Sequence, residues 1–302
     1  MPANMTLSGY LSDVYALTHE IRPETQRQYE ISVRLFERWA GGPVPLLELD
    51  PLRISAWLRD LSADRAPATV RAKRVQVMSL WRSAADDGLC QPPIRRVRSI
   101  QVPSHDPVAW THVEVCKLLS ATARLQRWHP CGLRRSAWWS LAIRVAWDTG
   151  LRWGDMISLR VDQVESAGVV RMVQAKTRRP ILCHLSPTTF AAAVASVELC
   201  PRGILLPWPR SHETFSKQVA HIVKLAGIRA GTWKYLRRGS ATDVELVERG
   251  AATAHLGHLP GSRIAATNYL DPVILGMNRP RPRELSEGGV GGGLASVGQR
   301  EV

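Results

Sequence analysis

The sequence contains no long hydrophobic run. A membrane-spanning helix needs roughly 18 consecutive apolar residues, and the most apolar segment, residues 138–147, is interrupted by Arg144. The N-terminus carries Asp13 and Glu20 and lacks the basic start and apolar block of an export signal. We therefore expect no membrane partner, no export and a cytoplasmic location.

Cysteine is scarce and unpaired. The five cysteines are odd in number, scattered and without a CxxC pair, which is typical of reduced thiols rather than of a disulfide framework or a zinc site. The closest pair of potential metal ligands is Cys183 and His184, but adjacent side chains on a strand point to opposite faces. We expect no bound metal and no cofactor.

Acidic residues are too few to balance the basic ones. The chain has 40 Lys and Arg against 26 Asp and Glu, for a net charge of +14. Basic side chains displace the counterions condensed on a phosphate backbone, so the expected partner is a polyanion. With 302 residues, 45% of them hydrophobic, the chain is long enough for two domains of roughly 100–200 residues with sizeable cores.

Helical patterns dominate the first ninety residues. Helix starts are predicted at Pro23, at Asp50–Pro51 and at Pro67, and the last of these helices should end at Gly88. Its basic side chains are predicted to be displayed and are candidates for DNA contact, with a plain solvated face as the alternative. They are Arg71, Lys73, Arg74 and Arg82. Proline and arginine are frequent over 93–107, which predicts an extended basic linker.

The second half combines helices with one hairpin. Thr111-x-x-Glu114 is a capping box that predicts a short helix, and a stronger helix over 136–149 should stop at Gly150. Alternating residues over 169–173 and 181–185 predict two strands that turn around 177–179, and helices resume near 187, 212 and 233. The predicted fold class is mainly α, with a helical first domain and a mixed, mostly helical second domain that contains a small β-hairpin.

Polar residues suited to phosphodiester chemistry follow one another in the second half. Cutting a phosphodiester without a metal needs a nucleophile, cations for the non-bridging oxygens and an acid for the leaving oxygen. Arginine suits the second task because its planar fork matches two phosphate oxygens, and lysine suits the third when nearby positive charge lowers its pKa. In chain order the candidates are Arg152 in Thr149-Gly150-Leu151-Arg152, Asp155 one turn later, Lys176 at the hairpin, Lys234 and Arg237 one turn apart, His258 in Leu256-Gly257-His258, and Tyr269.

This ordered set resembles the motifs of the tyrosine recombinase (phage integrase) family over about residues 108–272. That family has a TGLR segment, an acid one turn later, a hairpin lysine, an HxLR-type helix, an LGH and a following tyrosine. The resemblance implies a helical, SAM-like core-binding domain over 1–92 that grips double-stranded DNA, a basic linker over 93–107, a catalytic domain over 108–275 and a flexible tail over 276–302. It also implies a bacterial or phage-encoded, nucleoid-associated protein that assembles as a tetramer on DNA.

The resemblance implies a role for each residue. Tyr269 would attack phosphorus and form a 3′-phosphotyrosyl link, Arg152 and Arg237 would clamp the non-bridging oxygens, and Lys176 would protonate the leaving 5′-oxygen. Rejoining would then need neither ATP nor a metal. The implied activity is site-specific recombination or integration, as found in phages and mobile elements.

Three further residues have implied roles, and some positions depart from the family pattern. Lys234, which would assist proton transfer or phosphate binding, stands where histidine is commoner. His258 would hydrogen-bond the scissile phosphate, Asp155 would support Arg152, and the clamp is assigned to Arg237 rather than Arg238 by register alone. The segment between Gly250 and the LGH is short and the gap to the tyrosine long. These departures leave two alternatives open: a DNA-binding protein on the same scaffold that no longer cuts, and a type IB topoisomerase.

Overall fold

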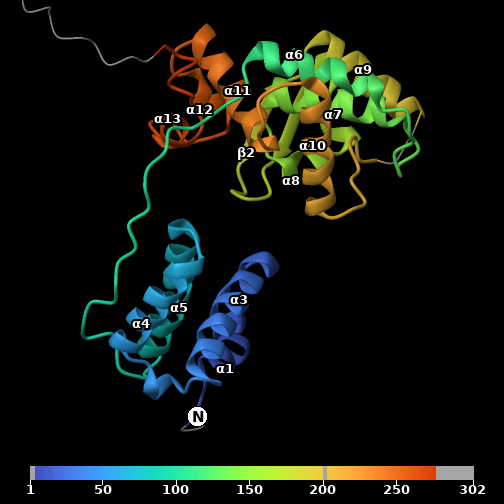
Figure 1. The fold of residues 1–302 in the computed structure, drawn as a ribbon. Helices are drawn as coiled ribbons and strands as arrows, with labels where there is room; N and C mark the ends of the chain where they lie inside the picture. Colours follow the sequence, from blue (N-terminus) through green and yellow to red (C-terminus); the bar gives the residue numbers. More distant parts are fainter. Residues whose placement is uncertain (1–3, 200–202, 277–302) are drawn as a thin grey trace, which may run out of the picture. The chain divides into compact units, whose positions relative to one another are not determined.

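The computed structural model describes residues 4–199 and 203–276 (Figure 1). The chain divides into two compact units, Met1–His105 and Asp106–Val302. The division lies inside the stretch that the sequence predicts to be a linker. The predicted tail lies, apart from its first residue, outside the described residues.

The first unit consists of helices alone within its described part. Its elements are α1 (Leu7–Tyr10), η1 (Leu11–Tyr15), α2 (Ala16–Thr18), α3 (Pro23–Ala40), η2 (Leu46–Glu48), α4 (Pro51–Asp64) and α5 (Pro67–Asp86). The predicted starts are confirmed because proline occupies the first turn of α3, α4 and α5. Asp50 also caps α4, since its carboxylate accepts from the amides of Leu52 and Arg53.

The core of this unit lies between α3, α4 and α5, and one predicted DNA contact belongs to it. Lys73 is only 6% exposed, because it follows Val70 by three residues and precedes Val77 by four on the inward stripe of α5. The expectation that Lys73 is displayed is therefore wrong. Arg71 and Arg82 are exposed as predicted, and Arg74 is half-buried.

Part of the predicted linker packs against the first unit. Val97 is buried in its core, and the Arg74 guanidinium donates to the carbonyls of Arg98 (2.7 Å) and Val97 (3.3 Å). The Arg98 amide in turn donates to Ser55 Oγ at 3.0 Å. The residues up to about 100 are thus fastened to α4 and α5, a packing that the prediction of a linker over 93–107 did not include.

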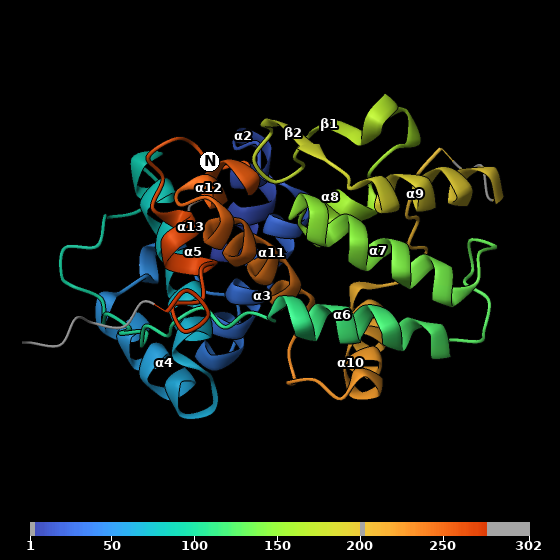
Figure 2. The ribbon, with the colours of Figure 1, turned by 90° about the horizontal axis from the view of Figure 1, so that it is seen from above.

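The second unit is built around α7. Its elements are α6 (His112–Ala121), η3 (Thr122–Arg124), α7 (Arg135–Thr149), α8 (Trp153–Ile157), η4 (Val161–Gln163), η5 (Ser166–Gly168), β1 (Val169–Val173), β2 (Pro180–His184), α9 (Pro187–Leu199), α10 (His212–Ala226), α11 (Trp233–Val247), α12 (Ala251–His255) and α13 (Ile264–Asn268). Helix α7 is apolar on most sides and packs against α6, α9 and α11; Figure 2 shows it between α6 and α9. The mainly α fold class with one small hairpin is confirmed.

The predicted local signals of this unit are confirmed with small shifts. Both hydrogen bonds of the capping box of Thr111 and Glu114 form, and α7 ends at Gly150. Strands β1 and β2 pair antiparallel from Val169 opposite His184 to Val173 opposite Pro180, so the second strand begins one residue earlier than predicted. Within the described residues no helix is long and apolar enough to cross a membrane.

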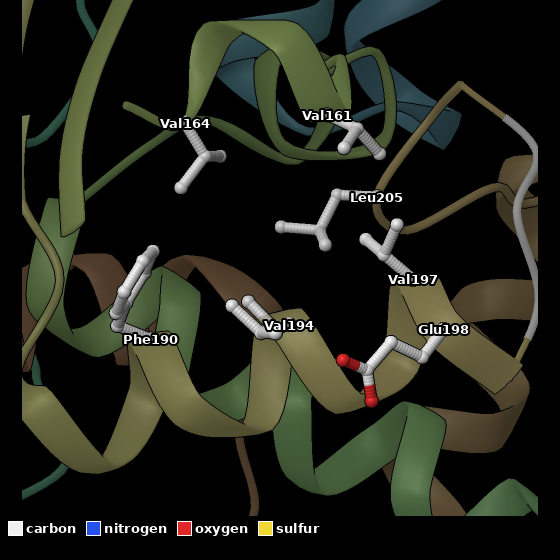
Figure 3. Close-up of a pocket in the computed structure, with 8 residues that line it drawn as sticks. Val161, Val164, Phe190, Val194, Val197, Glu198 and Leu205 are labelled. Carbon is white, nitrogen blue, oxygen red and sulfur yellow. The ribbon is translucent and has the colours of Figure 1, made fainter. Parts of the chain in front are cut away.

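An apolar pocket of about 150 Å³ lies between α9 and the η4 segment (Figure 3). Its lining is Val161, Val164, Phe190, Ala193, Val194, Val197, Glu198 and Leu205. The only charged side chain in this lining is the carboxylate of Glu198. Because no cation faces the pocket, it does not suit phosphate binding.

Candidate active site

Arg152 is placed by a sharp turn at the end of α7. Gly150 adopts a left-handed conformation, with φ of 57°, which glycine tolerates and other residues disfavour. The chain then turns into α8, and Arg152 is its N-cap residue. The carboxylate of Asp155, which is 2% exposed, lies 3.8 Å from the guanidinium of Arg152 and accepts a hydrogen bond from the Ala175 amide at 2.8 Å. Asp155 therefore connects the arginine to the hairpin.

Arg237 lies on α11 and is 5% exposed. Its guanidinium donates to the carbonyls of Gly150 and Leu256, so it joins the arginine turn to the LGH segment. Burial lowers the pKa of Arg237 to about 10, with the neighbouring Arg152 charge also lowering it and Tyr269 raising it. The group is still a cation at neutral pH.

Arg238 points elsewhere on the same helix. Its guanidinium donates to the carbonyls of Asn268 (3.0 Å) and Val108 (3.2 Å). Arg238 thus fastens the chain just before Tyr269, whereas the guanidinium carbon of Arg237 lies 5.0 Å from the centroid of the Tyr269 ring. This geometry distinguishes two arginines that adjacent sequence positions leave ambiguous.

Tyr269 follows α13 directly and is half-buried. Burial raises the pKa of its phenol, but the positive charges of Arg237, Arg152 and Lys234 outweigh burial and leave the pKa below the usual 10. A lowered pKa favours the phenolate, which is the nucleophilic form.

The segment after Tyr269 is anchored by the buried Asp271. One carboxylate oxygen accepts from the Ala109 amide at 2.9 Å, and the Asp271 amide donates to Thr242 Oγ1 at 3.1 Å. The tyrosine is therefore held in place by residues of its own chain.

A cavity of about 600 Å³ gathers most of the predicted site residues. Its lining is Arg152, Lys176, Thr177, Arg179, Gly257, His258, Leu259, Pro260, Gly261, Ser262, Ile264 and Tyr269. Arg237 lies buried behind Tyr269, and Lys234 is exposed outside the lining, although its charge lowers the pKa of Tyr269. The cavity is thus rich in cations, beside one phenol and one imidazole.

His258 of the LGH segment and His255, which precedes this segment, have different surroundings. The ring of His258 lies 5.5 Å from that of Tyr269, and within the described part of the chain its buried Nδ1 has no hydrogen-bond partner. Burial, followed by the charges of Arg237, Arg152 and Arg179, lowers the pKa of His258. His255 instead lies 2.6 Å from Ser240 Oγ, and burial lowers its pKa to about 4. His258 is the one that faces the cavity.

Sequence reasoning did not select Arg179 or Gln174 as residues of this site. Arg179 lines the cavity, and Gln174, which is fully buried, accepts a hydrogen bond from Arg152 at 2.9 Å. The signal for Gln174 was present, because it continues the inward alternation of Val170 and Met172 with a polar side chain.

Gly257 is expected to tolerate no side chain. Its φ is 66°, and an added Cβ would lie 2.9 Å from Ile181 Cγ2 and 3.0 Å from Gln174 Nε2. We expect Gly257→Ala to lower stability by about 1–3 kcal/mol, measured by thermal unfolding. Gly154→Ala is the matched control, because its Cβ meets open space. Equal unfolding midpoints for the two variants would contradict this account.

The comparisons with known proteins bear on the fold. No family model and no curated protein matches the sequence. A lambda integrase tetramer bound to a Holliday junction is similar in structure, with a TM-score of 0.67 and 21% identity over 85% of this chain and 78% of that one. A Tn1549 transposon integrase in complex with circular intermediate DNA has a TM-score of 0.65 and 14% identity over 91% and 100% of the two chains.

A third similar structure is the XerH site-specific recombinase bound to its difH substrate, with a TM-score of 0.63 and 17% identity over 86% of this chain and 82% of that one. At such low identity the likeness concerns the fold. It agrees with the resemblance that the ordered motifs indicated. The chain has the fold of the tyrosine recombinases.

Proposed function

We propose that this protein is a site-specific DNA recombinase that cuts and rejoins DNA through Tyr269. The observation that carries the proposal is a phenol that lines one cation-rich cavity with Arg152, Lys176 and His258, while the buried Arg237 lies against its ring. These residues come from five separate places in the sequence. A phosphodiester is the substrate that needs this combination of cations, acid and nucleophile.

The proposed reaction conserves the phosphodiester bond energy. The Tyr269 phenol gives its proton to water, the phenolate oxygen bonds to phosphorus, the bond from phosphorus to the 5′-oxygen breaks, and Lys176 gives that oxygen a proton. Arg152 and Arg237 neutralise the charge that builds on the non-bridging oxygens, and His258 hydrogen-bonds one of them. Lys234, exposed near the phenol, assists proton transfer or phosphate binding. Attack by a 5′-hydroxyl reverses these steps and rejoins the strand.

Double-stranded DNA is the proposed partner. The net charge of +14 favours it, and on the first unit the exposed Arg71 and Arg82 are the proposed phosphate contacts. Arg74 serves a structural role there, because its guanidinium holds two backbone carbonyls. Exchange of both strand pairs requires four active sites, so we propose assembly of four copies on DNA, as in the lambda integrase tetramer.

Covalent capture tests the proposal. The protein is mixed with a library of supercoiled plasmids carrying randomised inserts, and protein-linked DNA is recovered by potassium–dodecyl sulfate precipitation. Nicked duplexes are then built from the enriched inserts. We expect a covalent adduct whose DNA-linked peptide contains Tyr269. We also expect EDTA to leave its yield unchanged, because each catalytic task is assigned to a side chain.

The other outcomes separate the alternatives. Enrichment of DNA by binding, without any adduct, would contradict the enzyme proposal and favour a DNA-binding protein that does not cut. Relaxation of plasmids that carry no enriched insert, at the same rate as those that do, would favour a type IB topoisomerase. An adduct that EDTA abolishes would contradict the assignment of all tasks to side chains.

A further inference from the structure

The carboxamide of Gln174 contacts three parts of the candidate site. Its Oε1 accepts hydrogen bonds from Arg152 Nη1 at 2.9 Å and from Thr177 Oγ1 at 2.8 Å. Its Nε2 donates to the carbonyl of Leu256 at 3.3 Å. The side chain is completely buried. One neutral group therefore connects the arginine turn, the lysine hairpin and the LGH segment.

The chemistry of these partners determines the orientation of the amide. A guanidinium only donates and a backbone carbonyl only accepts, so the oxygen must face Arg152 and the nitrogen must face Leu256. The same Leu256 carbonyl accepts from Arg237 at 3.3 Å. Gln174 is thus linked to both arginines of the proposed clamp, to one directly and to the other through a shared acceptor.

The backbone of Gln174 also closes the hairpin loop. Its amide donates to the Arg179 carbonyl at 2.8 Å, and its carbonyl accepts from the Arg178 amide at 2.9 Å. Lys176 lies between these closures, next to Thr177. The position of Lys176 therefore depends on a residue whose side chain holds Arg152.

We propose that Gln174 is a positioning residue that sets Lys176 and Arg152 relative to each other, so that the acid and the clamp meet one phosphate. This inference rests on the proposed function. A neutral amide suits the task because it accepts from Arg152 without cancelling the charge that the phosphate needs. A carboxylate at this position would neutralise that charge and repel the Leu256 carbonyl.

Gln174→Met is the principal test, because it keeps the shape and removes all three side-chain bonds. We expect adduct formation on nicked duplexes to slow by about 10²-fold, the usual effect of a misplaced catalytic group, with unchanged affinity for the duplex. Thr177→Val is the matched variant, because it removes only the hairpin branch. It should slow the reaction less than Gln174→Met.

Modified duplexes separate positioning from a general loss of structure. A 5′-sulfur in place of the leaving 5′-oxygen departs without protonation by an acid. This substrate should therefore restore the adduct rate fully in Thr177→Val and in part in Gln174→Met. A methylphosphonate removes one non-bridging charge and should restore part of the Gln174→Met rate but none of the Thr177→Val rate. The proposal would be overturned if Gln174→Met slowed adduct formation equally on all three substrates. It would also be overturned if Gln174→Met reacted with the natural duplex as fast as the unmodified protein does.

Hydrogen exchange provides a readout that needs no activity. In Gln174→Met the amides of Ala175 and Arg178, both hydrogen-bonded in the loop, should exchange faster, while β1 and β2 keep their protection. Unchanged exchange of these two amides would refute the positioning role. If the unmodified protein forms no adduct at all, the proposed function fails, and the exchange result still decides the role of Gln174 in the hairpin.

Discussion

Tyr269→Phe is expected to abolish the covalent adduct completely while leaving DNA binding intact. The substitution removes only the phenolic oxygen, which is the proposed nucleophile. The ring keeps its place beside Arg237 and His258, so the cavity should retain its shape. The measurement is adduct formation on nicked duplexes, together with binding of the same duplexes.

Tyr235→Phe is the matched control. It is the only other tyrosine after residue 105, and its ring packs against Trp110 at 5.8 Å rather than at the cavity. We expect Tyr235→Phe to form the adduct at the same rate as the unmodified protein. An adduct that persists in Tyr269→Phe and is lost in Tyr235→Phe would reverse the assignment of the nucleophile.

Arg237→Lys is expected to slow adduct formation by about 10²–10³-fold, the usual effect of removing one group that stabilises the transition-state charge. Lysine keeps the charge but loses the planar fork that donates to the carbonyls of Gly150 and Leu256 and that is proposed to bind the phosphate. Arg238→Lys should have a smaller effect, because Arg238 is not part of the cavity lining and binds only the backbone carbonyls of Asn268 and Val108. Comparable losses in both variants would contradict the register assigned to the clamp.

The pH dependence of the same reaction gives a second readout. The charge of Arg237 lowers the pKa of Tyr269, while burial alone would raise it. If the phenolate is the nucleophile, the adduct rate rises with pH, and the midpoint of this rise lies below the usual phenol pKa of 10. In Arg237→Ala the pKa of Tyr269 should rise, so the midpoint should move to higher pH. Circular dichroism shows whether each variant is folded. Arg237→Lys keeps the positive charge, so the midpoint should move less in it than in Arg237→Ala.

Helix α5 and the residues around Val97 show where local sequence signals succeed and where they fail. Proline and capping signals located α4, α5 and α6 closely because the physics of a helix start is local. The expectation for Lys73 failed for another reason: its spacing from Val70 and Val77 places it on the inward stripe of α5, but the expectation of exposure follows from its charge. Local signals failed for the residues around Val97, because packing against a core is a long-range property.

The sequence by itself determined the order of the chemical groups, the starts of α3 to α7 and the two strands to within about a residue, and a net charge that favours a polyanionic partner. These follow from residue type, short-range spacing and net charge. The sequence already favoured Arg237 by register and His258 by its motif, and the structure places both next to Tyr269. Only the tertiary structure decided that Lys73 is buried and that Gln174 holds the arginine turn to the hairpin. Such choices depend on contacts between segments far apart in the chain, which adjacent positions and short motifs do not encode separately.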